Sequence, residues 1–178
     1  MLVNTIFEDA VEQILDIAQR FSAALERAGI PNRIVGGLAV FLHVDARDPL
    51  AARLTRDVDI AFDRQWLDRV KAAVEPEGFV YRHAAGVDMF LETRSDRPRS
   101  AVRADYLEVV PESEPVRSAQ GLWLAPIADL VRMKLTSFRL KDQVHIQDRD
   151  RAGLIIGQVE ASLQEPLLQR LTAVRLSE

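Results

Sequence analysis

Cysteine is absent from this chain of 178 residues, so disulfides, thiolate metal ligands and cysteine nucleophiles are excluded. A long hydrophobic run is also missing. No uncharged apolar stretch approaches the roughly 18 to 20 residues that a membrane-spanning helix needs. The N-terminus carries acids within its first ten residues and does not resemble a secretory signal. We therefore expect a cytoplasmic protein with no membrane partner.

The chain also lacks an excess of basic residues. The net charge is −4 and the isoelectric point is about 5.5, which argues against a dedicated nucleic-acid binder. Of 23 basic residues only Lys71, Lys134 and Lys141 are lysines, so a lysine stands out as a point charge on a surface made mainly with arginine. Walker A, G-x-S-x-G and G-x-G-x-x-G motifs do not occur, which disfavours hydrolase triads and dinucleotide oxidoreductases.

Hydrophobic periodicity predicts both helices and strands. In chain order we expect a helix over 4–28, a strand, glycine turn and helix within 31–44, a strand over 57–62, a helix over 64–78, strands within 79–83, 87–93 and 100–110, and then helices, the first running from about 126 to 143. This pattern predicts an α/β (α+β) fold, a mixed sheet flanked by helices. Residues 1–120 would form the core, and residues 121–178 would form a C-terminal helical segment packed on it within one compact domain.

The segment RLTRDVDIAF, residues 53–62, places two acids inside a predicted strand, where aspartate is rare. Alternation along the strand puts Asp57 and Asp59 on one face while Val58 and Ile60 enter the core. Two such carboxylates repel each other unless something compensates their charge, and a hard divalent cation such as Mg²⁺ does so well. An edge strand with a solvated face and a neighbouring arginine is the alternative interpretation.

A second motif, IVGGLAV, places Gly36 and Gly37 between a predicted strand and a predicted helix. Backbone N–H groups at such a turn, together with the helix N-terminus, favour phosphate. Alone, the glycine pair would merely supply a turn. A strand, a Gly-Gly turn, a helix and then a strand bearing D-x-D form a far more specific combination, in which a phosphate cradle lies beside a metal-binding pair.

GGLAV followed by TRDVDIAF resembles the signature of the nucleotidyltransferase superfamily with the DNA polymerase β-like fold. The tail LAPIADLVRMKLTSFRLKDQVHIQDRD is similar to the helical segment of small bacterial proteins of the AbiEii-toxin-like group. The resemblance covers about residues 30–155. The chain departs from the pattern in two places: nineteen residues separate Gly37 from Asp57, and the tail reads HIQDRD where a simpler acidic and apolar pattern is usual.

The resemblance implies roles for individual residues. Gly36 and Gly37 would hold the triphosphate, and Asp57 and Asp59 would bind Mg²⁺ or Mn²⁺. A third acid on a neighbouring strand would complete the catalytic and metal-binding set, and Asp105 in VRADYLEV is the best candidate for it.

Alternatives to Asp105 as this third acid stay open. Asp88 in GVDMF competes for the role, and Asp105 itself could instead be a strand-end residue paired with Arg103. Were neither acid to reach the metal, the site would be incomplete.

Two lysines of the tail are candidate nucleotide-binding residues. Lys134 and Lys141 lie seven positions apart on what we expect to be one helix, so they would share a face and neutralise nucleotide phosphates. Alternatively, they would form a solvated stripe that pairs with Asp142 or Asp148.

The resulting hypothesis is a Mg²⁺-dependent nucleotidyltransferase that moves a nucleotidyl group from a nucleoside triphosphate to a hydroxyl acceptor and releases pyrophosphate. A catalytically inactive nucleotide-binding or partner-binding module of the same fold is the alternative. The sequence specifies neither the nucleotide nor the oligomeric state. It leaves a small molecule, tRNA and protein open as acceptors.

Overall fold

The computed structural model describes residues 2–49, 52, 55, 57–94, 99–106, 113–151, 153, 155 and 158–177. Side chains are described from residue 9 onward within these ranges, except at 99–101, 141, 145, 148, 151 and 158. The helices are α1 (Leu2–Arg27), α2 (Gly36–Asp45), α3 (Leu67–Val74), α4 (Ile127–Ser137), α5 (Leu140–Arg151), α6 (Gln158–Ala161) and α7 (Glu165–Leu176), with short 3₁₀ helices at Arg64–Trp66 and Glu75–Glu77. The strands are β1 (Arg33–Val35), β2 (Val58–Phe62), β3 (Phe79–Ala84), β4 (Val87–Glu92), β5 (Arg99–Tyr106), β6 (Val116–Arg117) and β7 (Trp123–Leu124).

The strands form one mixed sheet in the order β3-β4-β5-β2-β1-β7-β6. β2 pairs in parallel with β5 and antiparallel with β1, so the strand that carries the D-x-D acids lies at the centre of the sheet. The edge-strand interpretation of these acids is therefore wrong. The mixed α/β architecture with a helical C-terminal segment is confirmed.

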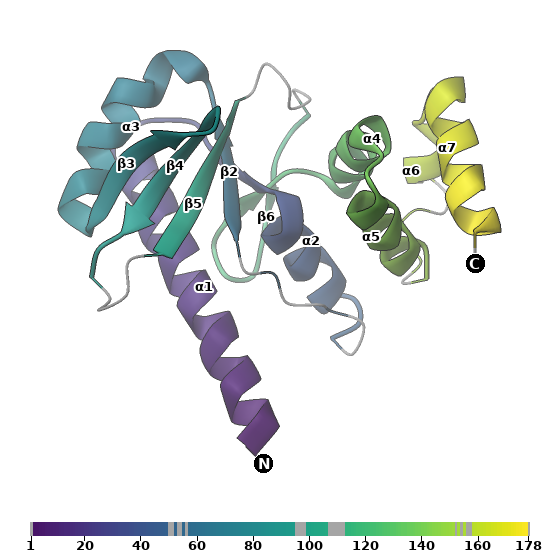
Figure 1. Cartoon of the computed structure of the whole chain (residues 1–178), viewed down its shortest axis with the longest axis horizontal. Helices are drawn as coiled ribbons and strands as arrows, with labels where there is room; N and C mark the ends of the chain where they lie inside the picture. The colour runs from purple at the N-terminus through teal and green to yellow at the C-terminus, as the bar shows by residue number, and fades with distance from the viewer. Residues whose placement is uncertain are drawn as a thin grey trace.

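One face of the sheet is the main hydrophobic core. Val58, Ile60 and Phe62 of β2 are fully or almost fully buried, as the alternation of β2 predicts. Helix α1 covers this face and crosses behind the strands in Figure 1. Its Phe21 contacts Phe79 of β3 and Phe90 of β4 edge to face, with centroid distances of 5.1 and 5.0 Å.

The C-terminal helices build a second hydrophobic cluster. It gathers Val131, Leu135, Ile146, Ile155, Val159, Leu163, Leu171 and Val174. Ile127 packs against both this cluster and the core of the sheet, and Figure 1 places α4–α7 on the side of α2, away from β3. The last strand of the sheet, β7, ends at Leu124, beyond the predicted boundary between the core and the helical segment at residue 120. That boundary stays a prediction. No helix in the described ranges is long and apolar enough to cross a membrane.

The single long helix predicted from residue 126 to 143 is wrong, because two helices occupy this segment. Phe138 adopts a left-handed conformation with φ of 47° and ends α4. Asp142 then accepts a hydrogen bond from the backbone N–H of Arg139 at 3.2 Å, next to the start of α5. An aspartate that bonds the backbone locally competes with a continuous helix, and helical periodicity does not reveal this competition.

Candidate functional site

The face of the sheet opposite α1 carries the predicted acids. Register on β2 and β5 places Asp59 opposite Arg103 and Ala61 opposite Asp105. Because residues two apart on a strand share a face, Asp59 and Asp105 project to the same side. Asp57 directly precedes β2, and its carboxylate lies 3.3 Å from Arg103, which projects to this side from β5. We call these three residues the acidic face. The parallel pairing of β2 and β5 thus brings together acids that lie more than forty residues apart in the sequence.

The glycine turn touches this acidic face. Val35, the residue before Gly36, lies opposite Asp59 in the β1–β2 register. A Cβ atom on Gly36 would lie 2.1 Å from Oδ2 of Asp59, and Gly36 has a φ of +62° that side chains rarely adopt. A Cβ atom on Gly37 would lie 2.5 Å from Oγ1 of Thr55. Both glycines are therefore required by close approach, and the turn packs directly against the acid.

Helix α2 begins at this turn and presents its N-terminus beside Asp59. Val35 occupies the N-cap position and makes no side-chain capping bond, and the first turn of α2 contains no acid. The first N–H groups of a helix lack intrahelical partners and carry the positive end of the helix dipole. This end of α2 is therefore suited to an anion such as a phosphate group.

The acidic face is electrostatically strained. Burial, followed by the charge of Asp105, raises the pKa of Asp59 to about 6, and Asp57 adds to this rise. Burial also raises the pKa of Asp105. The positive charges of Arg103 and Lys134 act in the opposite direction on both groups. The acids thus retain negative charge that a further cation would stabilise.

Asp57 already has a partner. Nη2 of Arg103 lies 3.3 Å from Oδ2 of Asp57, and both side chains are partly exposed. Among the described side chains, no group of three histidine or acidic residues is placed so that it could hold a metal ion as it stands. The three carboxylates nevertheless supply the hard oxygen donors that Mg²⁺ and Mn²⁺ prefer. One of them, Asp59, has a pKa that burial and the neighbouring acids raise and that a bound cation would lower. The chemistry of this donor set fits a divalent cation.

Lys134 connects the helical segment to the acidic face. Its Nζ donates to Oδ1 of Asp142 at 2.6 Å, and its charge is felt by both Asp59 and Asp105. Asp142 is fully buried and also accepts hydrogen bonds from Ser137 and from the side chain of Arg139. Although burial opposes ionisation, these donors hold the pKa of Asp142 well below its usual range. The predicted pairing of Lys134 with Asp142 is thus confirmed, but Lys134 is only 15% exposed and is an anchored cation instead of part of a solvated stripe.

Lys141 does not share a helix with Lys134. The break at Phe138 puts Lys134 on α4 and Lys141 on α5, so the expectation of a common face is wrong. The side chain of Lys141 lies outside the described residues.

Asp88 is not the third acid of the site. On β4 it shares a face with Phe90, which packs on α1, so it lies on the opposite side of the sheet from Asp105. It accepts hydrogen bonds from Tyr81 at 2.6 Å, from His83 at 2.7 Å and from Tyr106. Although burial opposes this, these bonds lower the pKa of Asp88 to about 2. Asp88 therefore acts as a structural acceptor that joins β3, β4 and β5.

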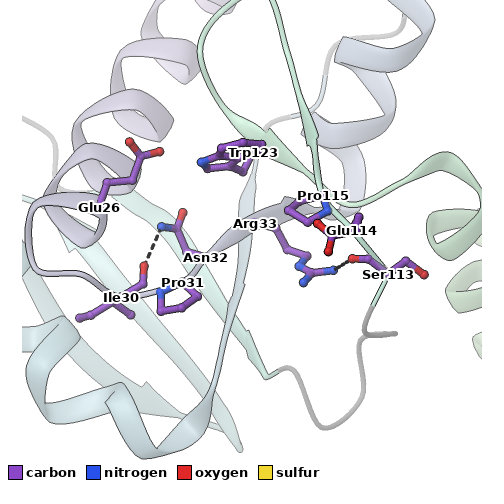
Figure 2. A pocket seen from close by; sticks show the side chains of 9 residues that line it. All are labelled: Glu26, Ile30, Pro31, Asn32, Arg33, Ser113, Glu114, Pro115 and Trp123. Atoms are coloured by element: carbon purple, nitrogen blue, oxygen red, sulfur yellow. Dashed lines mark hydrogen bonds between the residues drawn. The ribbon is translucent and has the colours of Figure 1, made fainter.

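A separate pocket of about 340 Å³ lies near the start of β1 and contains none of the acidic-face residues. Figure 2 shows Trp123, Glu26 and Asn32 around it, and Arg33 donating to the carbonyl oxygen of Ser113 at 2.6 Å. Asn32 is buried and hydrogen-bonded to Ser22 and to the carbonyl of Ile30. None of the candidate site residues identified from the sequence lines this pocket.

Comparison with known proteins bears on the fold. No family model and no curated protein sequence matches the chain. Solved structures do resemble it, among them one of a nucleotidyltransferase-like protein. The chain has a nucleotidyltransferase-like fold.

The first of these structures is the solution structure of the antibiotic-resistance factor ANT(2'')-Ia, at 15% identity and TM-score 0.51 over 94% of this chain and 85% of that one. The second is an antigenic nucleotidyltransferase-like protein from Paracoccidioides brasiliensis, at 15% identity and TM-score 0.67 over 95% and 90%. The third is ANT(2'')-Ia in complex with adenylyl-2''-tobramycin, at 18% identity and TM-score 0.55 over 92% and 97%. At these identities the likeness concerns the fold and does not extend to activity.

Substitution of Gly36 tests the close approach of the turn to Asp59. We expect Gly36→Ala to lower the free energy of unfolding in urea by at least about 2 kcal/mol more than Gly29→Ala does, because a new contact at 2.1 Å must be relieved. Gly29 is the matched control, since its φ is +66° and its Cβ would meet nothing within 4 Å. Equal losses for the two variants would contradict the contact.

The raised pKa of Asp59 predicts that this acid destabilises the metal-free fold. Because the folded-state pKa of about 6 lies above the ordinary 3.8, the folded state binds this proton more tightly than the unfolded state does. The folded state therefore loses stability as the pH rises through this window. At pH 8 in EDTA, Asp59→Asn should therefore raise the free energy of unfolding by roughly 1 to 3 kcal/mol, and the gain should vanish near pH 4. Urea titrations at both pH values measure it, with Asp9→Asn on the exposed surface of α1 as control. A lower free energy of unfolding for Asp59→Asn than for the wild type at pH 8 would contradict the raised pKa of Asp59.

Proposed function

We propose that the protein is a Mg²⁺-dependent nucleotidyltransferase, which transfers a nucleotidyl group from a nucleoside triphosphate to a hydroxyl acceptor and releases pyrophosphate. The observation that carries this proposal is the contact between Gly36 and Asp59. It joins an anion-binding helix N-terminus to an acidic face that needs a cation, and a metal nucleotide requires both sites side by side.

Asp57, Asp59 and Asp105 would hold the metal ion, with Mn²⁺ as a substitute for Mg²⁺. The bound ion would neutralise the nucleotide phosphates and stabilise the charge that develops during transfer. The pKa of Asp59 supports this assignment, because burial and the charges of Asp105 and Asp57 raise it and a bound cation would lower it.

The N–H groups of Gly36 and Gly37 would bind the triphosphate at the start of α2. Lys134 would contribute a fixed positive charge, since Asp142 holds its ammonium group in place. Lys141 is proposed as a further nucleotide-binding residue on α5.

The alternative to a metal-binding role for Asp105 is that of proton acceptor in the reaction. In the transfer step the acceptor hydroxyl oxygen forms a bond to the α-phosphorus, the bond from that phosphorus to the bridging oxygen breaks, and pyrophosphate leaves. The hydroxyl proton passes to the Asp105 carboxylate. A pKa raised by burial makes this carboxylate a better base than an ordinary surface aspartate.

The second candidate function is an inactive nucleotide-binding or partner-binding module of the same fold. The observation that favours it is the ion pair between Arg103 and Asp57, together with the absence, among the described side chains, of three histidine or acidic residues placed to hold a metal ion. The two functions differ in one measurable respect, because only the enzyme releases pyrophosphate.

Small hydroxylated molecules are the first acceptor class to test. One structural neighbour, ANT(2'')-Ia, is described in complex with adenylyl-2''-tobramycin. Proteins and tRNA remain acceptors to be tested in parallel. Membership of the AbiEii-toxin-like group stays a prediction.

Activity measurements test the proposed function. The protein is incubated with Mg²⁺, α-labelled triphosphates and an acceptor panel, and both transfer and pyrophosphate release are followed. We expect Asp59→Asn and Asp105→Asn to reduce kcat/KM by at least about 100-fold, and Lys134→Met to raise the KM for the nucleotide about tenfold, since they remove metal ligands and a phosphate-binding charge.

Lys71→Met is the matched control for Lys134, because Lys71 pairs with Asp68 on α3, away from the acidic face. Full transfer activity in the double variant Asp57→Asn, Asp59→Asn would refute the assignment. Metal-dependent nucleotide binding without any pyrophosphate release would select the inactive module.

A further inference from the structure

Arg103 occupies the middle of the acidic face. It lies opposite Asp59 in the β2–β5 register and two residues before Asp105 on the same strand, so its side chain projects to the same side. Its guanidinium is 3.3 Å from the carboxylate of Asp57. It is therefore a positive charge among the three carboxylates that a metal ion would need.

We propose that Arg103 is the resident counter-ion of the acidic face, and that a divalent cation must displace its guanidinium from Asp57 in order to bind. The inference rests on the proposed function, because it takes the acidic face to be the metal site. It assigns Arg103 a role in setting the metal concentration at which the site fills.

The two ions compete for the same carboxylate and repel each other at short distance. Oδ2 of Asp57 faces the Arg103 guanidinium, so this oxygen is not free to ligate a metal while the ion pair holds. A guanidinium and a divalent cation a few ångströms apart also repel, which disfavours simultaneous occupation. Loading of the metal thus requires the arginine side chain to swing away.

The environment of the pair allows this exchange. The side chains of Arg103 and Asp57 are 46% and 39% exposed, and ion pairs of such exposure are weak and readily broken. The other cation near the acidic face is different, because Lys134 is 15% exposed and its partner Asp142 is fully buried. The acidic face therefore combines one fixed cation with one exchangeable cation.

Direct metal binding tests the inference without any assay of activity. Binding of Mn²⁺ alone to the full chain is titrated by electron paramagnetic resonance, which counts the free hexaaquo ion. We expect Arg103→Met to bind Mn²⁺ about tenfold more tightly than the wild type, because a repelling charge is removed and Asp57 is released. Arg103→Lys, which keeps the charge, should stay within about threefold of the wild type.

Arg117→Met is the matched control. Arg117 forms a comparably exposed ion pair with Glu26, on a strand three positions from β2 in the sheet order, so its loss changes the net charge equally without touching the acidic face. We expect Arg117→Met to have the same Mn²⁺ dissociation constant as the wild type.

Thermal unfolding in EDTA gives a second readout. Arg103→Met should melt at a lower temperature than the wild type, and added Mg²⁺ should raise its melting temperature by more.

The outcomes separate the inference from the proposed function. Equal Mn²⁺ dissociation constants for the wild type and Arg103→Met would overturn the role of Arg103 and leave the metal site standing. Weaker binding in Arg103→Met would also overturn it. No Mn²⁺ binding by any variant, or undiminished binding by Asp59→Asn, would overturn the metal site and the inference together. Arg103→Gln replaces Arg103→Met should the latter fail to fold.

Discussion

Burial of Asp59 beside the carboxylates of Asp105 and Asp57 is the constraint that the surrounding structure accommodates. Buried carboxylates on adjacent strands favour protonation, and the pKa of Asp59 near 6 expresses this cost. The protein limits the cost with two cations, Arg103 and Lys134, and leaves part of it uncompensated. A group that destabilises the metal-free fold is typical of a site whose proper partner is a ligand, because such strain is retained where function requires it.

The scaffold places these charges through the central position of β2. Antiparallel β1 delivers the glycine turn to one side of Asp59, and parallel β5 delivers Asp105 to the other. The helical segment adds Lys134, whose position depends on the buried carboxylate of Asp142. The groups that we propose to bind phosphate and metal, together with Lys134, thus come from four elements that are separated in the sequence.

Much of the site could be predicted from local patterns. Period-two alternation predicts a common face for Asp57 and Asp59, and a Gly-Gly turn before a helix predicts the uncapped N-terminus of α2. Asp105 was correctly expected on a strand, and the parallel pairing with β2 places it on the acidic face. These features depend on short stretches of backbone whose geometry the residue types constrain strongly.

Other features depend on tertiary contacts that no single stretch encodes. The face occupied by Asp88 follows from the pairing of β4 with β5 and from three hydrogen-bond donors on β3 and β5. The break at Phe138 reflects a buried aspartate that organises the turn between α4 and α5. The sequence predicts Arg103 only as a partner for Asp105, although alternation along β5 places Arg103 on the same face as Asp105. Its pairing with Asp57 required the strand order.

Anomalous scattering would test the central claim most directly. A crystal of the protein grown with Mn²⁺ and a non-hydrolysable nucleoside triphosphate is measured at the manganese edge. The account predicts a peak about 2 Å from carboxylate oxygens of Asp59 and of at least one other member of the acidic face, with the triphosphate at the Gly36–Gly37 turn. A nucleotide bound elsewhere, or an acidic face without a manganese peak, would contradict it.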